Sequence, residues 1–514
     1  MQKFFNTSGP CVPEDHYTIH FEERFQNIYT LIENKKYFIL HAPRQTGKTT
    51  SMISLAKEIN EQQKYIAIYV NVEAGQAFRN DPEAVNEIIM SEFEYSAMTF
   101  LPKQYLPSED CYKTRSLNNG LGSFLTKWCM ELPKPLVVFM DEVDSLMGDS
   151  LITVLRQLRS GYNRRPKAFP HAMCLIGLRD IRDYRIYSDS TKKYIIGGSA
   201  FNIKEKSIRL NNFSLSQVKN LYYQHTDLTG QEFTTESIER IFELTDGQPW
   251  LVNALAREIC FENIISQGKT VTVEHVNTAK VVLIERRDVH LDQLADKLSE
   301  PRVMRVIQTI LLGEYEENNI LTDDIQYLID LGLIKQGVTG LEIANPIYRE
   351  VIPRELTTVT QISINQNPAW YIKENGKLNI DKLLEEYINF YKQHSEKITA
   401  RKTYTEAAHH LFFMAWLQRI VNSGGTINRE YAAGLKRLDI CVNFADELFA
   451  FELKLSSSNA LDDGKKQLVE YLNRLSLNQG YLIIFSRKRV DDLEQLGKRD
   501  VLEYEGKQID VIYL

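Results

Sequence analysis

The chain has 514 residues and a formal net charge of −7, with 43% apolar and 25% charged residues. The length predicts about three or four domains, and the composition is that of an ordinary globular protein, which excludes a mainly disordered chain. The negative net charge argues against a protein that coats nucleic acid through overall positive potential, so we expect any contact with DNA to be local.

The cysteines and the apolar runs indicate a cellular compartment. The six cysteines are scattered and form no Cys-x-x-Cys pair, which favours reduced cytosolic thiols over a disulfide framework or a zinc site. The N-terminus has no basic stretch leading into an apolar segment, and the longest apolar runs are far shorter than a membrane span. We therefore expect a cytoplasmic protein with no membrane contact.

The first motif lies between a predicted strand at residues 37–41 and a predicted helix at residues 50–59. It predicts a phosphate-binding loop in which Lys48 reaches the β- and γ-phosphates of ATP and the Thr49 hydroxyl ligates Mg²⁺. Ala42 stands where the pattern has its first glycine, so a turn that binds no nucleotide is the alternative. The predicted nucleotide-binding residues of the loop are Pro43, Arg44, Gln45, Thr46, Gly47, Lys48, Thr49 and Thr50.

A second buried strand, residues 136–140, ends in two acidic residues. We expect Asp141 to help hold the Mg²⁺ ion and Glu142 to be the catalytic residue that orients the attacking water. The alternative is that these carboxylates and Asp144 only cap the next helix. A further strand at residues 172–177 ends near Arg179, which is a candidate sensor of the γ-phosphate. The alternative for each candidate is a solvated surface position, and the competing candidates are Arg159, Arg164, Arg165, Arg182 and Arg185.

Residues 4–259 resemble a family of AAA-like, signal-transduction-type P-loop ATPases of bacteria and archaea. In that family alanine at the loop's first position is usual. The resemblance implies an ATPase core over residues 1–210 and a helical lid over residues 211–285, with Pro249 against the nucleotide. The alternative for Gly247, Gln248 and Pro249 is a plain turn between helices. The matching residues are Phe5, Asn6, Gly9, Pro10, Pro13, His16, Tyr17, residues 41–50, Gly247, Gln248, Pro249 and Trp250.

The middle of the chain predicts a winged-helix-like domain over residues 286–356. Its pattern is two short helices at residues 302–312 and 323–331, followed by a turn and a strand. The second helix is acidic, which favours packing or partner contact over DNA reading. Residues 357–400 are predicted to form a linker or bridging region.

Near the C-terminus, apolar and polar residues alternate along residues 438–444 and again along residues 449–455. This period of two predicts a hairpin that places Asp439, Glu452 and Lys454 on one face. Two carboxylates can bind Mg²⁺ and a lysine can position the attacking water, which is the chemistry of phosphodiester hydrolysis. The alternative is an ion pair on an exposed sheet face, between Glu452 or Asp439 and Lys454 or Arg437.

The same residues resemble the motif of the PD-(D/E)XK nuclease superfamily, over about residues 403–489. Leu438 stands where that family has a proline. The resemblance implies a restriction-endonuclease-like α/β domain over residues 401–514, with Asp439, Glu452 and Lys454 in the active site. It also implies that Glu406 helps to hold the metal and that Gln467 orients water or phosphate.

The whole sequence therefore predicts an α/β protein with an AAA-like core, a helical lid, a winged-helix-like segment and a nuclease-like domain. We expect an enzyme that uses ATP and Mg²⁺ to regulate cleavage of nucleic acid, most simply DNA, in defence or in the handling of mobile elements. The alternative is a signalling ATPase with a non-cleaving binding or oligomerisation module. Assembly into a homo-oligomer stays open, because a neighbouring subunit can supply an arginine to such sites.

Overall fold

The computed structural model divides the chain into two compact units, which we describe separately. The first contains Met1–Leu294 and Ile320–Arg349, and the second contains Ala295–Asn319 and Glu350–Leu514. No helix in the described part of the chain is long and apolar enough to cross a membrane. The structure describes residues 3–25, 27–113, 119–181, 184–188, 193–262, 268–286, 296–312, 321–337, 340–352, 371–373, 375–399, 413–414, 416–417, 426–433, 436–456, 459–486 and 496–514.

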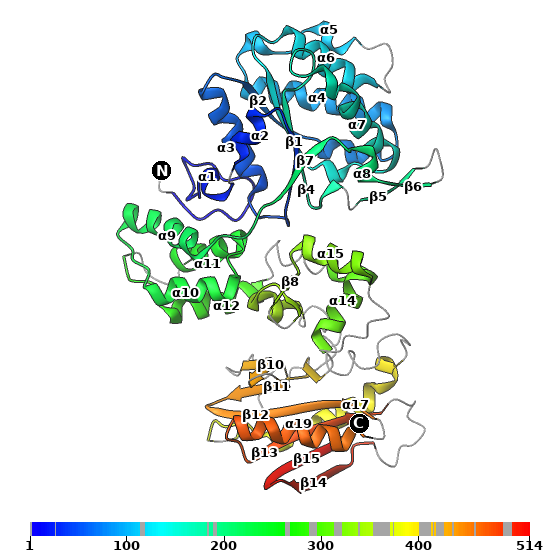
Figure 1. The fold of residues 1–514 in the computed structure, drawn as a ribbon. Helices are drawn as coiled ribbons and strands as arrows, with labels where there is room; N and C mark the ends of the chain where they lie inside the picture. Colours follow the sequence, from blue (N-terminus) through cyan, green and yellow to red (C-terminus); the bar gives the residue numbers. More distant parts are fainter. Residues whose placement is uncertain are drawn as a thin grey trace. The chain divides into compact units, whose positions relative to one another are not determined.

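A five-stranded parallel sheet in the order β2-β3-β4-β1-β7 forms the centre of the first unit (Figure 1). Its inner strands are nearly continuous apolar runs, as expected for parallel strands covered on both faces. His41 lies opposite Gly177, and Asn71 lies opposite Asp141, so the strands end at one edge of the sheet. The strands are β1 (Tyr37–His41), β2 (Ile66–Asn71), β3 (Leu136–Asp141), β4 (Ala172–Gly177) and β7 (Lys204–Arg209).

Helices cover both faces of this sheet (Figure 1). Side chains alternate between the faces, so that Tyr37 and Ile39 pack into one apolar cluster and Phe38 and Leu40 into the other. The larger helices are α2 (Ile28–Glu33), α3 (Lys48–Glu61), α4 (Pro82–Phe100), α6 (Gly120–Glu131) and α7 (Gly148–Gly161). The shorter elements are α1 (Phe21–Arg24), η1 (Glu73–Phe78), η2 (Lys103–Tyr105), α5 (Glu109–Tyr112), η4 (Val143–Ser145), η5 (Tyr162–Arg164), β5 (Arg185–Ser188), β6 (Lys193–Ile196) and α8 (Gly197–Ala200).

In the described residues of the segment where the sequence predicts a lid, four helices follow the sheet. Ser214 caps α9 with a reciprocal bond to Gln217, and Gly230 ends it in a left-handed conformation. Pro249 occupies the first turn of α11, where its missing N–H costs nothing. The helices are α9 (Leu215–Thr229), α10 (Thr235–Thr245), α11 (Pro249–Phe261) and α12 (Val273–Arg286).

The helices and the small hairpin expected between residues 286 and 356 are present, as α14 (Pro301–Leu312), α15 (Thr322–Leu331), β8 (Ile334–Gln336) and β9 (Leu341–Ile343). The compact units nevertheless separate them, because α14 packs within the second unit while the other three elements belong to the first. A winged-helix-like domain over residues 286–356 stays a prediction.

The second unit is built on a six-stranded mixed sheet in the order β10-β11-β12-β13-β15-β14. The predicted hairpin is confirmed as β11 and β12, which turn through Ala445 and Asp446, both with positive φ. Strand β12 runs parallel to β13 after a crossover through α19, which lies across the sheet in Figure 1. The strands are β10 (Thr426–Ala433), β11 (Lys436–Phe444), β12 (Glu447–Leu455), β13 (Gln479–Phe485), β14 (Arg499–Tyr504) and β15 (Lys507–Tyr513).

Apolar clusters on the two faces of this sheet pack against different helices. One cluster includes Leu468 and Leu472 of α19 (Ala460–Arg474). The other includes Leu384 and Tyr387 of α17 (Ile380–Thr399), which falls in the segment predicted as a linker. The structure differs from the expected boundary here, because the buried face of α17 makes it part of the core of the C-terminal fold.

Candidate functional site

The phosphate-binding loop connects β1 to α3 and exposes its backbone at the end of the sheet. Gly47 begins α3 with φ 86°, and Gln45 also has a positive φ. The Thr46 hydroxyl donates to the carbonyl of Pro43 at 2.8 Å, which closes the loop on itself. A Cβ atom on Gly47 would lie 2.8 Å from a guanidinium nitrogen of Arg24, so this position requires glycine for space as well as for φ.

Lys48 is buried under this loop. Its ammonium donates to the carbonyls of Ala42 at 2.8 Å and Pro43 at 2.9 Å, which uses two of its three donors. Burial lowers the pKa of Lys48, while the charges of Asp141 and Glu142 act in the opposite direction. The ammonium is therefore held between the loop and the acidic end of β3, with one donor left for a phosphate oxygen.

The two residues predicted to hold Mg²⁺ beside the loop meet in the structure. The Thr49 hydroxyl donates to Oδ2 of Asp141 at 2.6 Å, and the Tyr69 hydroxyl donates to the same oxygen at 2.7 Å. The Asp141 carboxylate is fully buried at the end of β3. A hydroxyl and a carboxylate in contact are the oxygen ligands that Mg²⁺ takes in nucleotide sites, so the residues fit that ion.

Glu142 follows Asp141 in a left-handed conformation with φ 57°, a strained geometry that turns it away from the strand. Burial, followed by the charges of Asp141 and Asp144, raises the pKa of Glu142 to about 7. Neither η4 nor α7 has a side-chain cap, and Asp144 accepts instead from the backbone N–H of Leu178 at 3.2 Å. These contacts disfavour the alternative that the carboxylates only cap a helix.

Arg179 lies directly after β4 and forms ion pairs with two acidic residues of α15. Its Nε donates to Asp330 at 2.9 Å, and a terminal nitrogen lies 3.3 Å from Asp323. The Asp330 carboxylate is almost completely buried. In this structure the guanidinium would have to leave both carboxylates to reach a phosphate, so its role as a γ-phosphate sensor stays a prediction.

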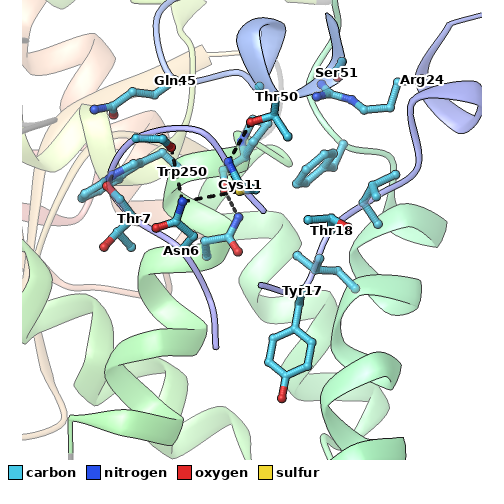
Figure 2. A pocket seen from close by; sticks show the side chains of 17 residues that line it. Asn6, Thr7, Cys11, Tyr17, Thr18, Arg24, Gln45, Thr50, Ser51 and Trp250 are labelled. Carbon is cyan, nitrogen blue, oxygen red and sulfur yellow. Dashed lines mark hydrogen bonds between the residues drawn. The ribbon is translucent and has the colours of Figure 1, made fainter. Parts of the chain in front are cut away.

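A pocket opens beside the phosphate-binding loop, and Figure 2 shows it from close by. Three segments line it: the N-terminal segment with Tyr17 and Thr18, the start of α3 with Thr50, and the lid with Pro249 and Trp250. Gln45 and Gly47 also reach it, whereas Arg44 is exposed. The predicted contact of Pro249 with the nucleotide stays a prediction that this position supports.

Sequence reasoning missed Tyr69 and Arg24 at this site. Tyr69 lies in a strand, and no sequence motif around it indicates a role at the site. The pairing of β2 with β3 brings it to Asp141. Arg24 lies 22 residues before Thr46, whose carbonyl accepts from it. No spacing rule connects these positions.

A second cluster lies in the C-terminal unit on β11 and β12. Oδ2 of Asp439 accepts from the backbone N–H of Leu453 at 2.8 Å, and Nζ of Lys454 lies 2.9 Å from Oε1 of Glu452. The structure therefore brings these three predicted residues together. Glu452 is only 3% exposed, which contradicts the alternative of an ion pair on an exposed sheet face.

The remaining polar groups of this cluster point to an incomplete shell around Glu452. Burial, followed by the charge of Asp439, raises the pKa of Glu452 to about 8. Among the residues that the structure describes, its Oε2 atom and the Oε1 atom of Gln467 are buried and have no hydrogen-bond partner. Burial, followed by the charges of Glu452 and Asp439, also raises the pKa of Tyr471, one turn after Gln467 on α19.

The carboxylates of this cluster fit a sparsely ligated ion. Within the part of the chain that the structure describes, no three His, Cys, Asp or Glu side chains gather as a metal site. Mg²⁺ usually keeps several waters and needs only one or two carboxylates, so the pair Asp439 and Glu452 is compatible with that ion. Glu406, predicted as a further ligand, lies outside the described residues.

The parallel sheet, the loop over the first turn of α3 and the acidic end of β3 together define a P-loop ATPase. Residues 16–352 match the family model described as AAA-like domain. The chain belongs to the AAA-like domain family, and the expected ATPase half is thereby confirmed. The match ends before the six-stranded sheet of the second unit, and a search of curated proteins found no match.

Several solved structures are similar to the chain at low identity. A Walker-type ATPase of Pyrococcus abyssi has 16% identity and a TM-score of 0.47, covering 68% of this chain and 99% of that chain. The RuvB Holliday junction branch migration motor of Thermotoga maritima has 12% identity and a TM-score of 0.34, covering 63% and 91%. Cdc6p from Pyrobaculum aerophilum has 16% identity and a TM-score of 0.34, covering 67% and 95%.

Proposed function

We propose that the nucleotide state of this ATPase regulates a magnesium-dependent DNA nuclease in the C-terminal unit. The observation that carries the proposal is the buried Glu452 carboxylate, which lies beside Lys454 and faces the charge of Asp439. A buried acidic side chain with an unpaired oxygen is costly unless a ligand completes its shell. A divalent ion that binds both Glu452 and Asp439 would give this oxygen a partner.

In the first unit, the amides at the start of α3 bind phosphate oxygens, and Lys48 supplies its remaining donor to them. Thr49 and Asp141 would hold Mg²⁺, which would supply positive charge beside the phosphate oxygens. Glu142 accepts a hydrogen bond from the attacking water and aligns it with the terminal phosphorus. The raised pKa of Glu142 suits a group that takes up a proton near neutral pH.

In the second unit, Asp439 and Glu452 would hold Mg²⁺, and a bound Mg²⁺ would supply the positive charge that activates water for phosphodiester hydrolysis. Lys454 lies on the same face and positions the attacking water once its ammonium moves from Glu452. Gln467 orients water or phosphate through its unpaired carbonyl oxygen or its amide nitrogen. DNA is the substrate that we propose, with contact confined to this face because the chain as a whole is acidic.

One contact favours the alternative that the C-terminal unit binds or assembles without cleaving. The Lys454 ammonium already neutralises Glu452 at 2.9 Å, so the pair is stable without a metal. In that case the unit would act as a non-cleaving binding or oligomerisation module of a signalling ATPase.

The nuclease proposal is tested with purified full-length protein on plasmid and single-stranded DNA, with Mg²⁺ and with or without ATP. We expect Glu452→Gln to lower cleavage by about 100-fold or more, because it removes a charged metal ligand. Asp446→Asn, the same acid-to-amide change in the exposed turn of that hairpin, should cleave as the wild type does. Lys48→Ala should alter the dependence of cleavage on ATP. Hydrolysis of ATP without any cleavage would favour the alternative.

The ATPase mechanism predicts that Glu142→Gln separates binding from turnover. The amide cannot take up a proton, so hydrolysis should fall by about 100-fold or more while ATP still binds. Phosphate release and equilibrium ATP binding measure the two quantities. Retention of full turnover would remove Glu142 from the reaction.

A further inference from the structure

Arg24 lies in the wall of the pocket beside the phosphate-binding loop, at the end of the short helix α1. Its guanidinium donates to the carbonyl of Thr46 at 2.7 Å and to the carbonyl of Asn211 at 2.8 Å, and it stacks 4.8 Å from the ring centre of Phe213. Figure 2 shows the side chain extending towards Ser51 and Thr50. The loop, the segment before the lid and α1 therefore converge on one cation.

This cation has no anion beside it in the described part of the chain. No carboxylate of the described residues forms an ion pair with Arg24, whereas the partly exposed Arg240, Arg257 and Arg474 each have one. Burial alone lowers the pKa of Arg24, to about 10. The Arg24 side chain is partly buried and meets neutral carbonyls instead of a carboxylate, so a bound anion would give its charge a partner. Two of its five N–H donors point to carbonyls, so others remain for a ligand.

The position of Arg24 selects the part of the nucleotide that it can reach. Lys48 lies on the side of the loop that faces Asp141 and Glu142, where the terminal phosphates react. Arg24 lies against Gly47 and lines the nucleoside pocket together with Thr50 and Ser51. The anionic group between the loop and this pocket is the phosphate that joins the nucleoside.

We propose that Arg24 binds the α-phosphate of the nucleotide and so recognises nucleoside phosphates at the pocket side of the loop. The inference rests on the proposed nucleotide-binding function and adds a residue to it. Because a planar guanidinium matches two phosphate oxygens at once, lysine would replace it only in part.

The test compares the dissociation constants of ATP, ADP, AMP and adenosine for the full-length wild-type protein and for Arg24→Gln. We expect about a 10-fold or greater loss for each of the three phosphorylated ligands, by a similar factor, and no change for adenosine. AMP is the most informative probe, because the α-phosphate is its only phosphate. Arg24→Lys should bind AMP more tightly than Arg24→Gln and less tightly than the wild type.

Arg165→Gln is the matched control, since Arg165 also donates to backbone carbonyls and stacks on an aromatic ring, but lies outside this pocket. It should leave all four constants unchanged. Equal loss of adenosine and AMP in Arg24→Gln would overturn the proposal and assign Arg24 to the shape of the pocket, as would unchanged AMP binding. A wild-type protein that binds no nucleotide would instead refute the proposed function on which the inference rests.

Discussion

His225 illustrates how single residues connect the helices after the sheet to the pocket beside the phosphate-binding loop. The Gln231 amide donates to the carbonyl of Lys269, so its oxygen faces His225 and accepts from Nε2 at 2.9 Å. The other ring nitrogen, Nδ1, then accepts from the Tyr17 hydroxyl at 2.9 Å. Tyr17 lines the pocket. The hydrogen bonds therefore fix a neutral imidazole that holds this tyrosine.

This arrangement predicts a dependence of stability on pH. Burial lowers the pKa of His225 below its usual value of 6.5, with the Gln231 contact acting in the opposite direction. The unfolded chain therefore takes up the proton first, and stability is lost as the pH falls below that value, by at most about 1.4 kcal/mol per pH unit. Denaturant unfolding from pH 7.5 to 5 should show a smaller slope for His225→Gln than for the wild type. Identical slopes would contradict the prediction.

At the scale of elements, α15 is tied to the ATPase core by the ion pair of Arg179. The Asp330 carboxylate is almost fully buried. The guanidinium carbon of Arg179 lies 5.4 Å from the ring centre of Tyr327, which belongs to the same helix as Asp330. Gly332 ends α15 with φ 74°, and a Cβ there would lie 2.7 Å from the Pro43 ring in the phosphate-binding loop. One short helix thus contacts both the loop and the arginine after β4.

At this scale we predict that the two acidic partners of Arg179 contribute unequally to the free energy of unfolding. Asp330→Ala leaves a buried guanidinium without its main partner and should lower the free energy of unfolding of the first unit by about 3 kcal/mol. Asp323→Ala is the matched control: its side chain is 42% exposed and lies farther away, so we expect a loss below about 1 kcal/mol. Equal losses in a denaturant titration would show that burial does not set the strength of this contact.

At the scale of the whole molecule, the buried face of α17 decides where the C-terminal unit begins. Both apolar clusters of its sheet are composed of residues between 371 and 514. Leu383, Leu384 and Tyr387 are fully buried in one of them. A division at residue 400 would remove these side chains from the core they fill.

We therefore predict that a fragment of residues 371–514 unfolds cooperatively on heating and that residues 401–514 do not. The shorter fragment loses several large buried side chains, and each costs about 2–5 kcal/mol when it is truncated. Circular dichroism during a thermal scan measures the difference. A cooperative transition in the shorter fragment would show that α17 is dispensable.

The sequence by itself determined the P-loop ATPase, because the loop, its strand and its helix are local, and Gly47, Lys48 and Thr49 are recognised by spacing alone. It also determined the β11–β12 hairpin, because alternation along two adjacent strands is a local signal. The nuclease role of Asp439, Glu452 and Lys454 and the DNA substrate remain proposals.

Only the tertiary structure decided which distant residues join these motifs. The parallel pairing of β2 with β3 brings Tyr69 to Asp141, and α1 brings Arg24 to the loop. The docking of α15 engages Arg179, and packing transfers α17 from a predicted linker to a core. These contacts join segments that are far apart in the chain. A local sequence pattern does not predict them, because the whole fold decides which strands pair and which side chains are buried.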